Sequence, residues 1–485
     1  MTVALTSTLP IVDNERLPVT SGQTIAHVNP ATGKAQDEIV LAGGEEVDLA
    51  VAAARAASPA WRELPSSDRR NLLWRVGELI DSHADELAAL GILENGTPAA
   101  FATVACSTFP AEYFRYFAGW TEKIHGDLAP VYPQRAIDYV MHEPFGVVAA
   151  MVPWNGPLGL IGMKVPAALA AGNTIVLKPS ELAPYTAMRL GELFVEAGFP
   201  PGVVNVLVGD AVAGDALVRH PGVDRISFTG GTSTGKRIMA AASERLTPLS
   251  LELGGKSASL VFADCDLDTA IALAVQTGIA MQSGQACMAP TRLLVERSVY
   301  GQVVDEIREL AECLDVGDPQ DPSTLMGPLI TEASCNRVLS LIAAAADRGD
   351  GRLVTGGRRL DGELADGYYV EPTVFADVDP TSPLAQTEIF GPVLSIIPFD
   401  SDEEAVKIAN ATSYGLAGFV YTNDLKRAHR VAAALEAGYI GVNAFPFLPG
   451  PAPFGGYKQS GFGRELGADA VKEFTRTKNV YIDLE

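Results

Sequence analysis

The segment VDRISFTGGTSTGKRIMAAAS, residues 223–243, combines a strand, a turn and a helix within 21 residues. VDRISFTG predicts a β-strand, and the pair Gly230–Gly231 marks a sharp turn. The run TSTGKRIMAAAS then predicts a helix, which Gly235 opens. A strand–turn–helix unit of this kind is the building block of α/β proteins with parallel sheets.

The same alternation of strands and helices extends over most of the chain. Residues 138–153 predict strand, turn and strand, residues 163–172 a helix and residues 202–210 a strand. A second series of the same kind begins near Pro248. Strands that alternate with helices of this length imply βαβ units. We therefore predict an α/β fold with two Rossmann-like parallel-sheet domains that meet near Leu253.

The composition is that of a globular chain with a strongly acidic balance. Its 485 residues suffice for two or three domains, and 47% hydrophobic and 20% charged residues are typical of such domains. The formal net charge of −23 argues against nucleic acid and anionic membranes as partners, because both would repel the chain. No apolar run reaches about 18 residues, and residues 1–18 do not resemble a secretory signal, so we expect a cytoplasmic protein.

Neither the cysteines nor the histidines are arranged for a structural site. The five cysteines are widely spaced and include no CxxC pair, which argues against a disulfide framework and a zinc site. The six histidines show no paired spacing typical of metal ligands, so we expect no metal. A lone cysteine is usually a small buried hydrophobic residue.

Cys287 differs from the other cysteines in its surroundings, QSGQACMAPTR. Gly284 precedes it by three residues and Pro290 follows by three, which predicts a loop or a helix end. Thiolates are stabilised at such places. Cys287 is therefore a candidate nucleophile, and a buried structural cysteine is the alternative.

Two polar residues near strand ends are candidates to act with a nucleophile. Glu252 lies in the strand-like SLEL before Gly254–Gly255, where an apolar setting would raise its pKa and suit a general base. The alternative is an exposed glutamate at the end of a strand. Asn155 lies in an irregular turn between Pro153 and Pro157. Its amide either donates to a developing oxyanion or satisfies the local backbone.

Seven short motifs follow one another along the chain. They are PWN at 153–155, KPSE at 178–181, FTGGTSTG at 228–235, ELGGK at 252–256, GQAC at 284–287, EIFGP at 388–392 and PFGGYKQSG at 453–461. The glycine spacing of the third is not GxGxxG, so alone it is a weak sign of a dinucleotide site. In this order the seven motifs resemble the aldehyde dehydrogenase superfamily.

The resemblance implies a catalytic cycle on Cys287. This cysteine attacks the aldehyde carbon, and Asn155 together with the backbone N–H of the cysteine holds the thiohemiacetal oxyanion. A hydride then leaves for a nicotinamide, and Glu252 activates the water that hydrolyses the thioester. Family members that pass the acyl group to coenzyme A tend to lack this glutamate, so a free carboxylic acid is the expected product. Lys164 and Glu473 match a proton-relay pair, with a structural ion pair as the alternative.

The resemblance also implies a dinucleotide site. The Glu181 carboxylate would accept hydrogen bonds from the adenosine ribose and would repel a 2′-phosphate, which favours NAD over NADP. The family usually has serine at the position of Gly231, so a hydroxyl contact to the pyrophosphate is lost here. The residues implied for the cofactor are Trp154, Lys178, Ser180, Glu181, Gly230, Gly231, Gly235, Leu253, Glu388 and Phe390.

The positions that match the family's aldehyde tunnel are apolar or lack a side chain. None of them is an arginine or lysine that could clamp a second carboxylate, which argues against semialdehydes of dicarboxylic acids. Methionine and glycine at sites where the family often has aromatic residues predict a wide, adaptable tunnel. We expect hydrophobic aliphatic, terpenoid or aromatic aldehydes. The eight positions are Gly156, Leu160, Met163, Met281, Met288, Phe447, Leu448 and Phe454.

By the same resemblance, three parts of the chain have separate tasks. Residues 1–122 and 142–252 form the NAD-binding domain, and residues 253–466 form the catalytic domain. Residues 123–141 and 467–485 form a small β element that joins subunits into a homodimer or homotetramer. An ordinary terminal strand is the alternative for the last segment.

Two other functional classes compete with this hypothesis. A cysteine hydrolase or acyltransferase without redox chemistry would want a histidine partner for Cys287, and no motif above contains one. A catalytically silent binding protein on the same scaffold is disfavoured because Cys287, Glu252 and Asn155 are all present.

Overall fold

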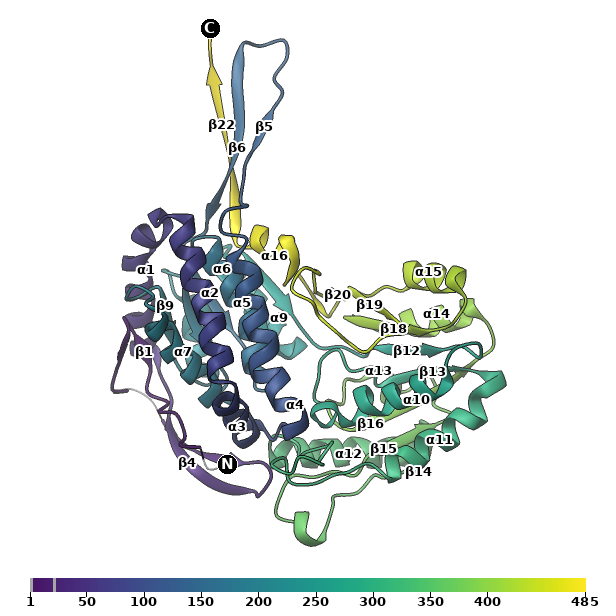
Figure 1. Cartoon of the computed structure of the whole chain (residues 1–485). Coiled ribbons are helices and arrows are strands. Elements are labelled where there is room, and N and C mark those ends of the chain that lie inside the picture. The colour runs from purple at the N-terminus through teal and green to yellow at the C-terminus, as the bar shows by residue number, and fades with distance from the viewer. Residues whose placement is uncertain (1–2, 21–22) are drawn as a thin grey trace.

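Two sheets form the body of the computed structural model, which describes residues 3–20 and 23–485 (Figure 1). The strands of the first sheet lie in the order β2 (Glu15–Arg16), β1 (Ile11–Val12), β9 (Val204–Val206), β8 (Thr174–Lys178), β7 (Val147–Met151), β10 (Arg225–Thr229), β11 (Leu249–Glu252) and β21 (Gly461–Phe462). Those of the second lie in the order β14 (Arg352–Thr355), β15 (Thr373–Ala376), β16 (Val393–Phe399), β13 (Arg292–Glu296), β12 (Ala258–Val261), β18 (Ala417–Tyr421) and β19 (Tyr439–Val442).

The central strands of both sheets run parallel. In the first sheet the parallel run extends from β9 to β11. In the second it extends from β15 to β19. Antiparallel pairs occur only at the margins, where β14 and β21 pair with their neighbours and β1 pairs with β2 and β9. The predicted α/β class with two parallel-sheet domains is therefore confirmed.

Helices cover both faces of the first sheet, and β7 shows the consequence. Its side chains alternate between the two faces, so Val147, Ala149 and Met151 enter one core and Val148 and Ala150 the other. A parallel strand buried on both faces has no solvent side, which explains the wholly apolar VVAAM. One face is covered by α1 (Gly44–Glu63), α8 (Ala211–Arg219) and α9 (Thr232–Ser243), the other by α2 (Ser66–Ser82), α5 (Phe109–Ala118), α6 (Pro157–Ala170) and α7 (Tyr185–Ala197).

The second sheet is covered in the same way, and its core is continuous with the first. The apolar cluster that includes α5 and α6 also includes helices α10 (Leu267–Val275) and α11 (Tyr300–Glu312) of the second domain. The two lobes therefore share one hydrophobic core at their junction. The other face of the second sheet packs on α12 (Glu332–Arg348), α14 (Asp402–Asn410) and α15 (Leu425–Ala434).

Shorter elements connect these layers. The strands among them are β3 (Thr24–Asn29), β4 (Lys34–Val40), β17 (Tyr414–Gly415) and β20 (Tyr457–Lys458). The helical ones are α3 (Ala84–Asn95), α4 (Ala99–Thr103), η1 (Val104–Thr108), η2 (Gln276–Ala280), η3 (Met281–Gly284), η4 (Arg297–Val299), η5 (Gly362–Leu364), α13 (Pro383–Gln386) and α16 (Gly467–Glu473). In residues 3–20 and 23–485, no helix is both long enough and apolar enough to span a bilayer.

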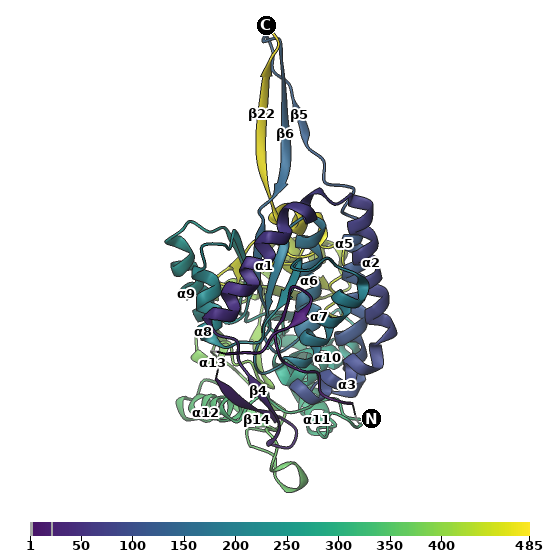
Figure 2. The same ribbon diagram turned by 90° about the vertical axis from the view of Figure 1, so that its left-hand side faces the viewer.

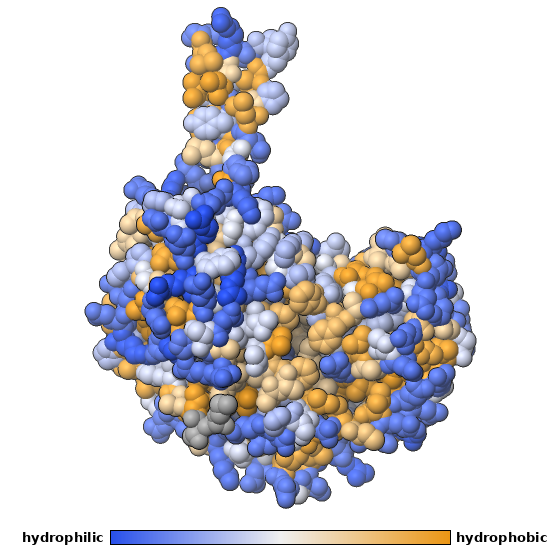
Figure 3. Space-filling model, in the orientation of Figure 1, coloured by the Kyte–Doolittle hydropathy of each residue, from blue (hydrophilic) through white to orange (hydrophobic). Residues whose placement is uncertain are grey.

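A three-stranded antiparallel arm projects from the body (Figures 1 and 2). It consists of β5 (Asp127–Ala129), β6 (Ala136–Pro144) and β22 (Thr475–Asp483), and β22 pairs with β6 over nine residues. Apolar side chains are exposed along the arm, where Figure 3 shows a cluster of orange. The exposed apolar residues on its strands include Leu128, Ile137, Met141, Tyr481 and Ile482.

The predicted limits of the β element differ from those of the arm at the C-terminal side. Helix α16 packs against α6 of the body and buries Ala470 and Val471. The arm therefore begins at Thr475 rather than at residue 467. In addition, β21 belongs to the first sheet although it lies within residues 253–466, the predicted catalytic range.

The pairing of β21 with β11 requires glycine at position 461. Gly461 lies opposite Glu252, and its φ of +112° is a conformation that side chains disfavour. A Cβ atom there would also overlap the carbonyl oxygen of Leu251. The close approach of the two strands thus depends on a missing side chain.

We predict that Gly461→Ala destabilises the protein, because it adds both backbone strain and a steric clash. The strain alone costs about 1–3 kcal/mol, so the melting temperature measured by differential scanning calorimetry should fall by several degrees. Gly231→Ala is the matched control, since its φ is −68° and within the described residues nothing lies within 4 Å of an added Cβ. Equal melting temperatures for the two variants would contradict the prediction.

Candidate active site

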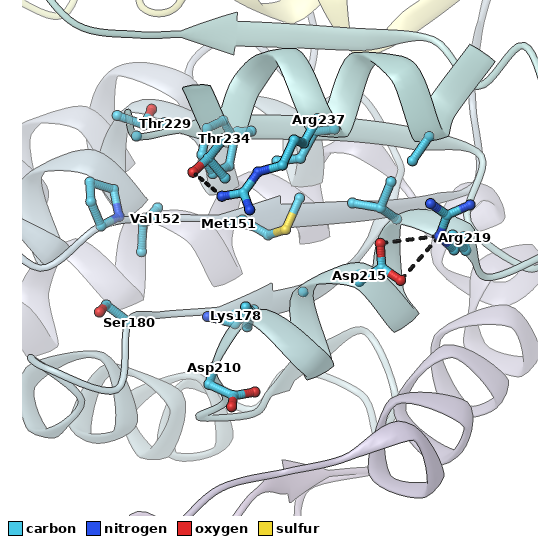
Figure 4. Close-up of a pocket in the computed structure, with 18 of the residues that line it drawn as sticks. Met151, Val152, Lys178, Ser180, Asp210, Asp215, Arg219, Thr229, Thr234 and Arg237 are labelled. Atoms are coloured by element: carbon cyan, nitrogen blue, oxygen red, sulfur yellow. Dashed lines mark hydrogen bonds and ion pairs between the residues drawn. The ribbon is translucent and has the colours of Figure 1, made fainter. Parts of the chain in front are cut away.

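The carboxyl ends of four parallel strands meet at one edge of the first sheet. The register pairs Met151 with Lys178, Phe228 with Met151 and Thr229 with Glu252. Figure 4 shows Met151, Lys178 and Thr229 side by side at this edge. Four of the sequence motifs begin at or just after these strand ends, and ligands of α/β proteins bind at this edge.

The loop that carries Cys287 turns through left-handed backbone. Helix α10 passes at Val275 into the π-helix η2, and a short 3₁₀ turn follows. Gln282, Ser283 and Gly284 have φ values of 50°, 55° and 71°. A side chain at Gly284 would overlap the carbonyl oxygen of Gly391, so this turn requires glycine.

The glycine turn after Glu252 packs directly on the cysteine loop. A Cβ atom at Gly255 would overlap the backbone carbonyl of Cys287, and one at Gly254 would overlap the Glu388 carboxylate. The N–H of Gly255 donates to Glu388 Oε1 at 3.0 Å. The structure therefore brings the ELGGK, GQAC and EIFGP motifs into contact.

Asn155 faces the same loop from the end of β7. Its Nδ2 donates to the backbone carbonyl of Gln285 at 2.9 Å, and the backbone carbonyl of Asn155 accepts from Gln282 Nε2. The second N–H of an amide NH₂ group remains available for another acceptor. Asn155 is thus bound to Gln285, the residue two positions before Cys287, and its second N–H can donate to another acceptor.

Burial changes the protonation of Cys287. The half-buried thiol lies close to Glu388 and Glu252, and burial followed by these two carboxylates raises its pKa to about 12. Backbone N–H groups of Met288 and Cys287 lower the pKa but do not outweigh the burial. The expectation of a thiolate stabilised by an open loop is therefore wrong, and at neutral pH the thiol needs a base.

Glu252 lies in a buried cluster with Lys164 and Glu465. Lys164 forms an ion pair with Glu465 and donates to Ser227 Oγ at 3.2 Å. Burial and then Glu465 raise the pKa of Glu252 well above its ordinary value, and Lys164 opposes them. Within the described residues neither oxygen of Glu252 has a hydrogen-bond partner. A buried, unpaired carboxyl with a raised pKa has the character of a general base.

The predicted pairing of Lys164 with Glu473 is wrong. Glu473, at the end of α16, forms an ion pair with Arg225 at 2.6 Å and is partly exposed. Glu465 is the partner of Lys164, because a bridge between Phe454 and Glu465 turns its side chain inward. Glu465 and Glu473 both follow the PFGGYKQSG motif and are eight residues apart. Only their tertiary contacts show which of them pairs with Lys164.

A cavity of about 650 Å³ lies between α8, α9 and the strand ends (Figure 4). Five of the residues predicted to bind the cofactor line it: Trp154, Lys178, Ser180, Glu181 and Gly230. Sequence reasoning missed further residues that line the cavity, because nothing in their local pattern distinguishes them from surface helix residues. Among them are Asp210, Asp215, Arg219, Thr234 and Arg237.

Five predicted cofactor residues do not line this cavity. Gly235 packs under Leu253, where a Cβ atom would approach Leu253 Cδ2 to 2.5 Å. Phe390 contacts the ring of Trp154, with ring centroids 5.6 Å apart. Glu388 lies at the glycine turn described above, and Gly231 is the N-cap of α9. These residues therefore lie outside the lining of the cavity, and Glu388 lies close to Cys287.

The donors of the cavity fit an anionic dinucleotide. Among the described residues no side chain caps the N-terminus of α9, whose N–H groups can therefore face a phosphate. Lys178 is buried and donates to the carbonyl of Pro179 at 3.2 Å. Burial lowers the pKa of Lys178, while Glu181 and Asp210 raise it.

Several of the residues predicted for the aldehyde tunnel belong to the hydrophobic cluster against which Cys287 packs. Met163, Met288 and Phe454 are buried in the same hydrophobic cluster against which Cys287, Leu160 and Leu448 pack. Met281 and Gly156 are half-buried, and Phe447 is 46% exposed. Sequence reasoning missed two residues of α5 on this side: Phe109, whose ring lies 5.8 Å from that of Phe447, and Tyr113, whose hydroxyl donates to the Leu448 carbonyl at 2.7 Å.

Comparison with known proteins gives one consistent result. Residues 18–480 match the model of the aldehyde dehydrogenase family, and no group of side chains suited to a metal ion occurs in the described ranges. An aldehyde dehydrogenase of Emericella nidulans is 40% identical over 476 residues, which cover 98% of this chain and 94% of the relative.

Solved structures agree over nearly the whole chain. PnpE from Pseudomonas sp. WBC-3 is 41% identical with a TM-score of 0.96, covering 99% of this chain and 98% of that one. An aldehyde dehydrogenase from Bacillus cereus, solved as its NAD⁺ complex, is 41% identical with a TM-score of 0.96, covering 99% and 97%. The chain therefore belongs to the aldehyde dehydrogenase family.

Proposed function

We propose that this protein oxidises a hydrophobic aldehyde to its carboxylic acid with NAD, through a thioester on Cys287. The observation that carries the proposal is the contact of the ELGGK turn with the cysteine loop. This contact brings Cys287, Glu252 and Asn155 to the strand edge beside the dinucleotide-sized cavity. A nucleophile, a base and an oxyanion donor are the three groups that acyl chemistry on a thiol requires.

The first chemical task is to ionise the thiol. Since the pKa of Cys287 is about 12, a neighbouring carboxylate must accept its proton, and Glu252 is close enough to influence that pKa. The raised pKa of Glu252 makes it a stronger base than an exposed glutamate. The thiolate then attacks the aldehyde carbon, and Asn155 Nδ2 with the Cys287 N–H donates to the resulting oxyanion.

The second task is hydrolysis of the thioester. NAD, when bound, supplies the acceptor for the hydride that leaves the thiohemiacetal carbon. Glu252, after passing the thiol proton on through Lys164 and Glu465, takes a proton from the water that attacks the thioester carbon, and the Cys287 sulfur leaves as a thiolate with the carboxylic acid as product. Lys164 and Glu465, in contact with each other beside Glu252, form a path for that proton in place of the pair predicted from sequence.

The cofactor preference rests on Glu181. Its carboxylate lines the cavity next to Ser180, whose hydroxyl donates to Glu181 Oε2 at 3.3 Å. A carboxylate there accepts hydrogen bonds from ribose hydroxyls and repels a 2′-phosphate. NAD⁺ bound to the Bacillus cereus relative supports the same choice.

The substrate class rests on the apolar side of Cys287. Within the described residues, nothing lies closer than 3.8 Å to a Cβ atom placed at Gly156. The flexible Met163, Met281 and Met288 adapt to different shapes. Aliphatic, terpenoid and aromatic aldehydes fit such a surface better than aldehydes with a second carboxylate.

The arm is the surface through which we propose that copies of the chain assemble. Its exposed apolar residues lie on β5, β6 and β22, away from the body. Exposed apolar patches of this kind mark protein interfaces, and the free strand edges can pair with another chain. A homodimer or homotetramer in the cytoplasm is the expected state.

Glu252→Gln should still release about one equivalent of NADH per active site and then stall, but the release should be slower than in the wild type because the amide cannot take the proton of the Cys287 thiol. The amide cannot accept a proton from water, so steady-state turnover should fall by about 10²–10⁴. Absorbance at 340 nm follows the burst, and mass spectrometry of the quenched protein should find the acyl group on Cys287. Glu143→Gln is the control, because Glu143 is also buried but pairs with Arg62 and Lys478. Intact turnover in Glu252→Gln would refute the role.

Wild-type protein should show a higher kcat/KM with NAD than with NADP. Glu181→Gln removes the charge that repels the 2′-phosphate. The ratio of kcat/KM with NAD to kcat/KM with NADP should therefore fall by about tenfold or more, chiefly because the KM for NADP falls. Initial rates with both cofactors at saturating aldehyde test this. Glu244→Gln, another cavity carboxylate, is the control. A wild-type preference for NADP would overturn the assignment.

Hexanal and benzaldehyde should be better substrates than succinic semialdehyde. Gly156→Phe should narrow the tunnel and lower kcat/KM for benzaldehyde about tenfold or more, while acetaldehyde is affected little. Steady-state kinetics with the four aldehydes measure this. Strong preference of the wild type for succinic semialdehyde, or an equal effect of Gly156→Phe on all four, would contradict the proposed substrate class.

A further inference from the structure

The last turn of α3 carries two buried polar residues that belong to no motif of the sequence. Glu94 is fully buried and Asn95 is 8% exposed. Their side chains contact two different loops of the candidate site. A buried polar side chain without its partners is costly, so these contacts fix the geometry of both loops relative to α3.

Asn95 holds the peptide that leads into Asn155. Its Nδ2 donates to the carbonyl of Trp154 at 3.0 Å. Its Oδ1 accepts from the backbone N–H of Thr97 at 3.1 Å and from the Thr97 hydroxyl at 2.7 Å. These two bonds define which end of the amide is oxygen, so the NH₂ group must face Trp154.

The chain of hydrogen bonds continues from Asn155 to the cysteine loop. Asn155 donates to the carbonyl of Gln285, two residues before Cys287. Gln285 in turn is fixed by its own amide, which donates to the Pro328 carbonyl at 3.3 Å and accepts from the N–H of Ile330 at 3.0 Å. Asn155 thus lies between two anchored segments, one of which depends on Asn95.

Glu94 holds the second loop through α7. Its carboxylate accepts from the N–H of Tyr185 at 2.6 Å, from the N–H of Thr186 at 3.1 Å and from the Thr186 hydroxyl. Within the described residues the N-cap of α7, Pro184, supplies no side-chain cap, so Glu94 takes that role from another helix. Helix N-termini favour a negative group at this place.

The position of α7 determines where the KPSE segment ends. Only residues 182–184 separate Glu181 from the first residue of the helix. The β8 strand fixes the other end of the segment at Lys178. Glu94 therefore anchors one side of the ribose-facing loop, while Asn95 anchors the oxyanion-facing loop after β7.

We propose that Glu94 and Asn95 are positioning residues that set the cofactor loop and the oxyanion amide from one rigid helix end. Asn95 acts through Asn155 on the chemical step, and Glu94 acts through residues 178–181 on cofactor binding. The inference rests on the proposed function. Its specific content is that two adjacent buried residues affect two different kinetic parameters.

Asn95→Asp is the most selective test of the first half. It keeps the shape and the acceptor for Thr97 but replaces the donor facing the Trp154 carbonyl by an oxygen. The NADH burst rate at saturating NAD and aldehyde should fall about 10–100-fold, with the NAD dissociation constant unchanged within about twofold. Thr97→Val is the control, because it removes one contact of Asn95 but leaves the bond to Trp154.

A double variant separates positioning from general destabilisation. If Asn95 acts through Asn155, Asn95→Asp should have little further effect on the burst rate in an Asn155→Ala background. Full additivity of the two effects would overturn the proposal. Asn95→Ser, which lacks the opposed oxygen, provides a second variant if Asn95→Asp folds poorly, and it should show the same dependence on Asn155.

Glu94→Gln tests the second half in the same way. The amide keeps one acceptor oxygen but turns N–H donors toward the donors of Tyr185 and Thr186. The dissociation constant for NAD, measured by titration calorimetry, should rise about tenfold, with the burst rate at saturating NAD nearly unchanged. Its effect on NAD binding should largely disappear in a Glu181→Ala background.

The outcomes distinguish this inference from the proposed function. If wild-type protein produces no NADH from any aldehyde, the proposed function fails. Crystal structures of Asn95→Asp and Glu94→Gln then test the positioning directly, since the Trp154–Asn155 peptide or residues 178–181 should be displaced. Unchanged positions in those structures, or equal effects of both variants on the burst rate and on NAD binding, would refute it.

Discussion

The common register of β7, β8, β10 and β11 is the constraint on which the whole site depends. These strands are parallel and end at the same level, so the residues that follow each of them must meet. Their side chains are buried on both faces of the sheet, so a ligand can contact these strands only at their ends. The glycine turn after β11 then allows the cysteine loop of the second domain to approach within backbone contact.

Two carboxyl groups are buried close together at this edge of the sheet. The Lys164 ammonium lies with the carboxyl groups of Glu252 and Glu465, and all three are buried; the Arg464 guanidinium also lowers the pKa of Glu252. Burying a second carboxylate beside Glu465 is costly, which raises the affinity of Glu252 for a proton. Glu465 has the direct ion pair, so Glu252 is the carboxylate that can take up a proton and pass it on. Proteins retain such unbalanced groups where they serve chemistry.

The sequence predicted the parts of the molecule that depend on local pattern. The alternation around residues 223–243 identified the parallel sheets, because apolar strands and amphipathic helices follow from periodicity alone. The motifs likewise singled out Cys287, Glu252 and Asn155 as candidates, and their loops lie in contact in the structure. What failed depends on tertiary contacts. Local pattern cannot reveal that burial raises the pKa of Cys287, nor that Glu465 rather than Glu473 turns toward Lys164. Glu94 and Asn95 were missed for the same reason, since Glu and Asn are ordinary residues at a helix end.

The pairing of β6 with β22 links residues 136–144 to residues 475–483. A ribosome releases the chain from its N-terminus, so β6 has no partner in the arm's longest ladder until residues 475–483 have emerged. The same delay applies to β21 and to Glu465, which complete the sheet edge beside Glu252. A nascent chain that stops before residue 461 would contain the parallel strands of both sheets and Cys287. It would lack β21 and the Lys164–Glu465 ion pair, which lie beside Glu252. The surroundings of Glu252 and the longest ladder of the arm are therefore both incomplete until residues 461–483 have been made.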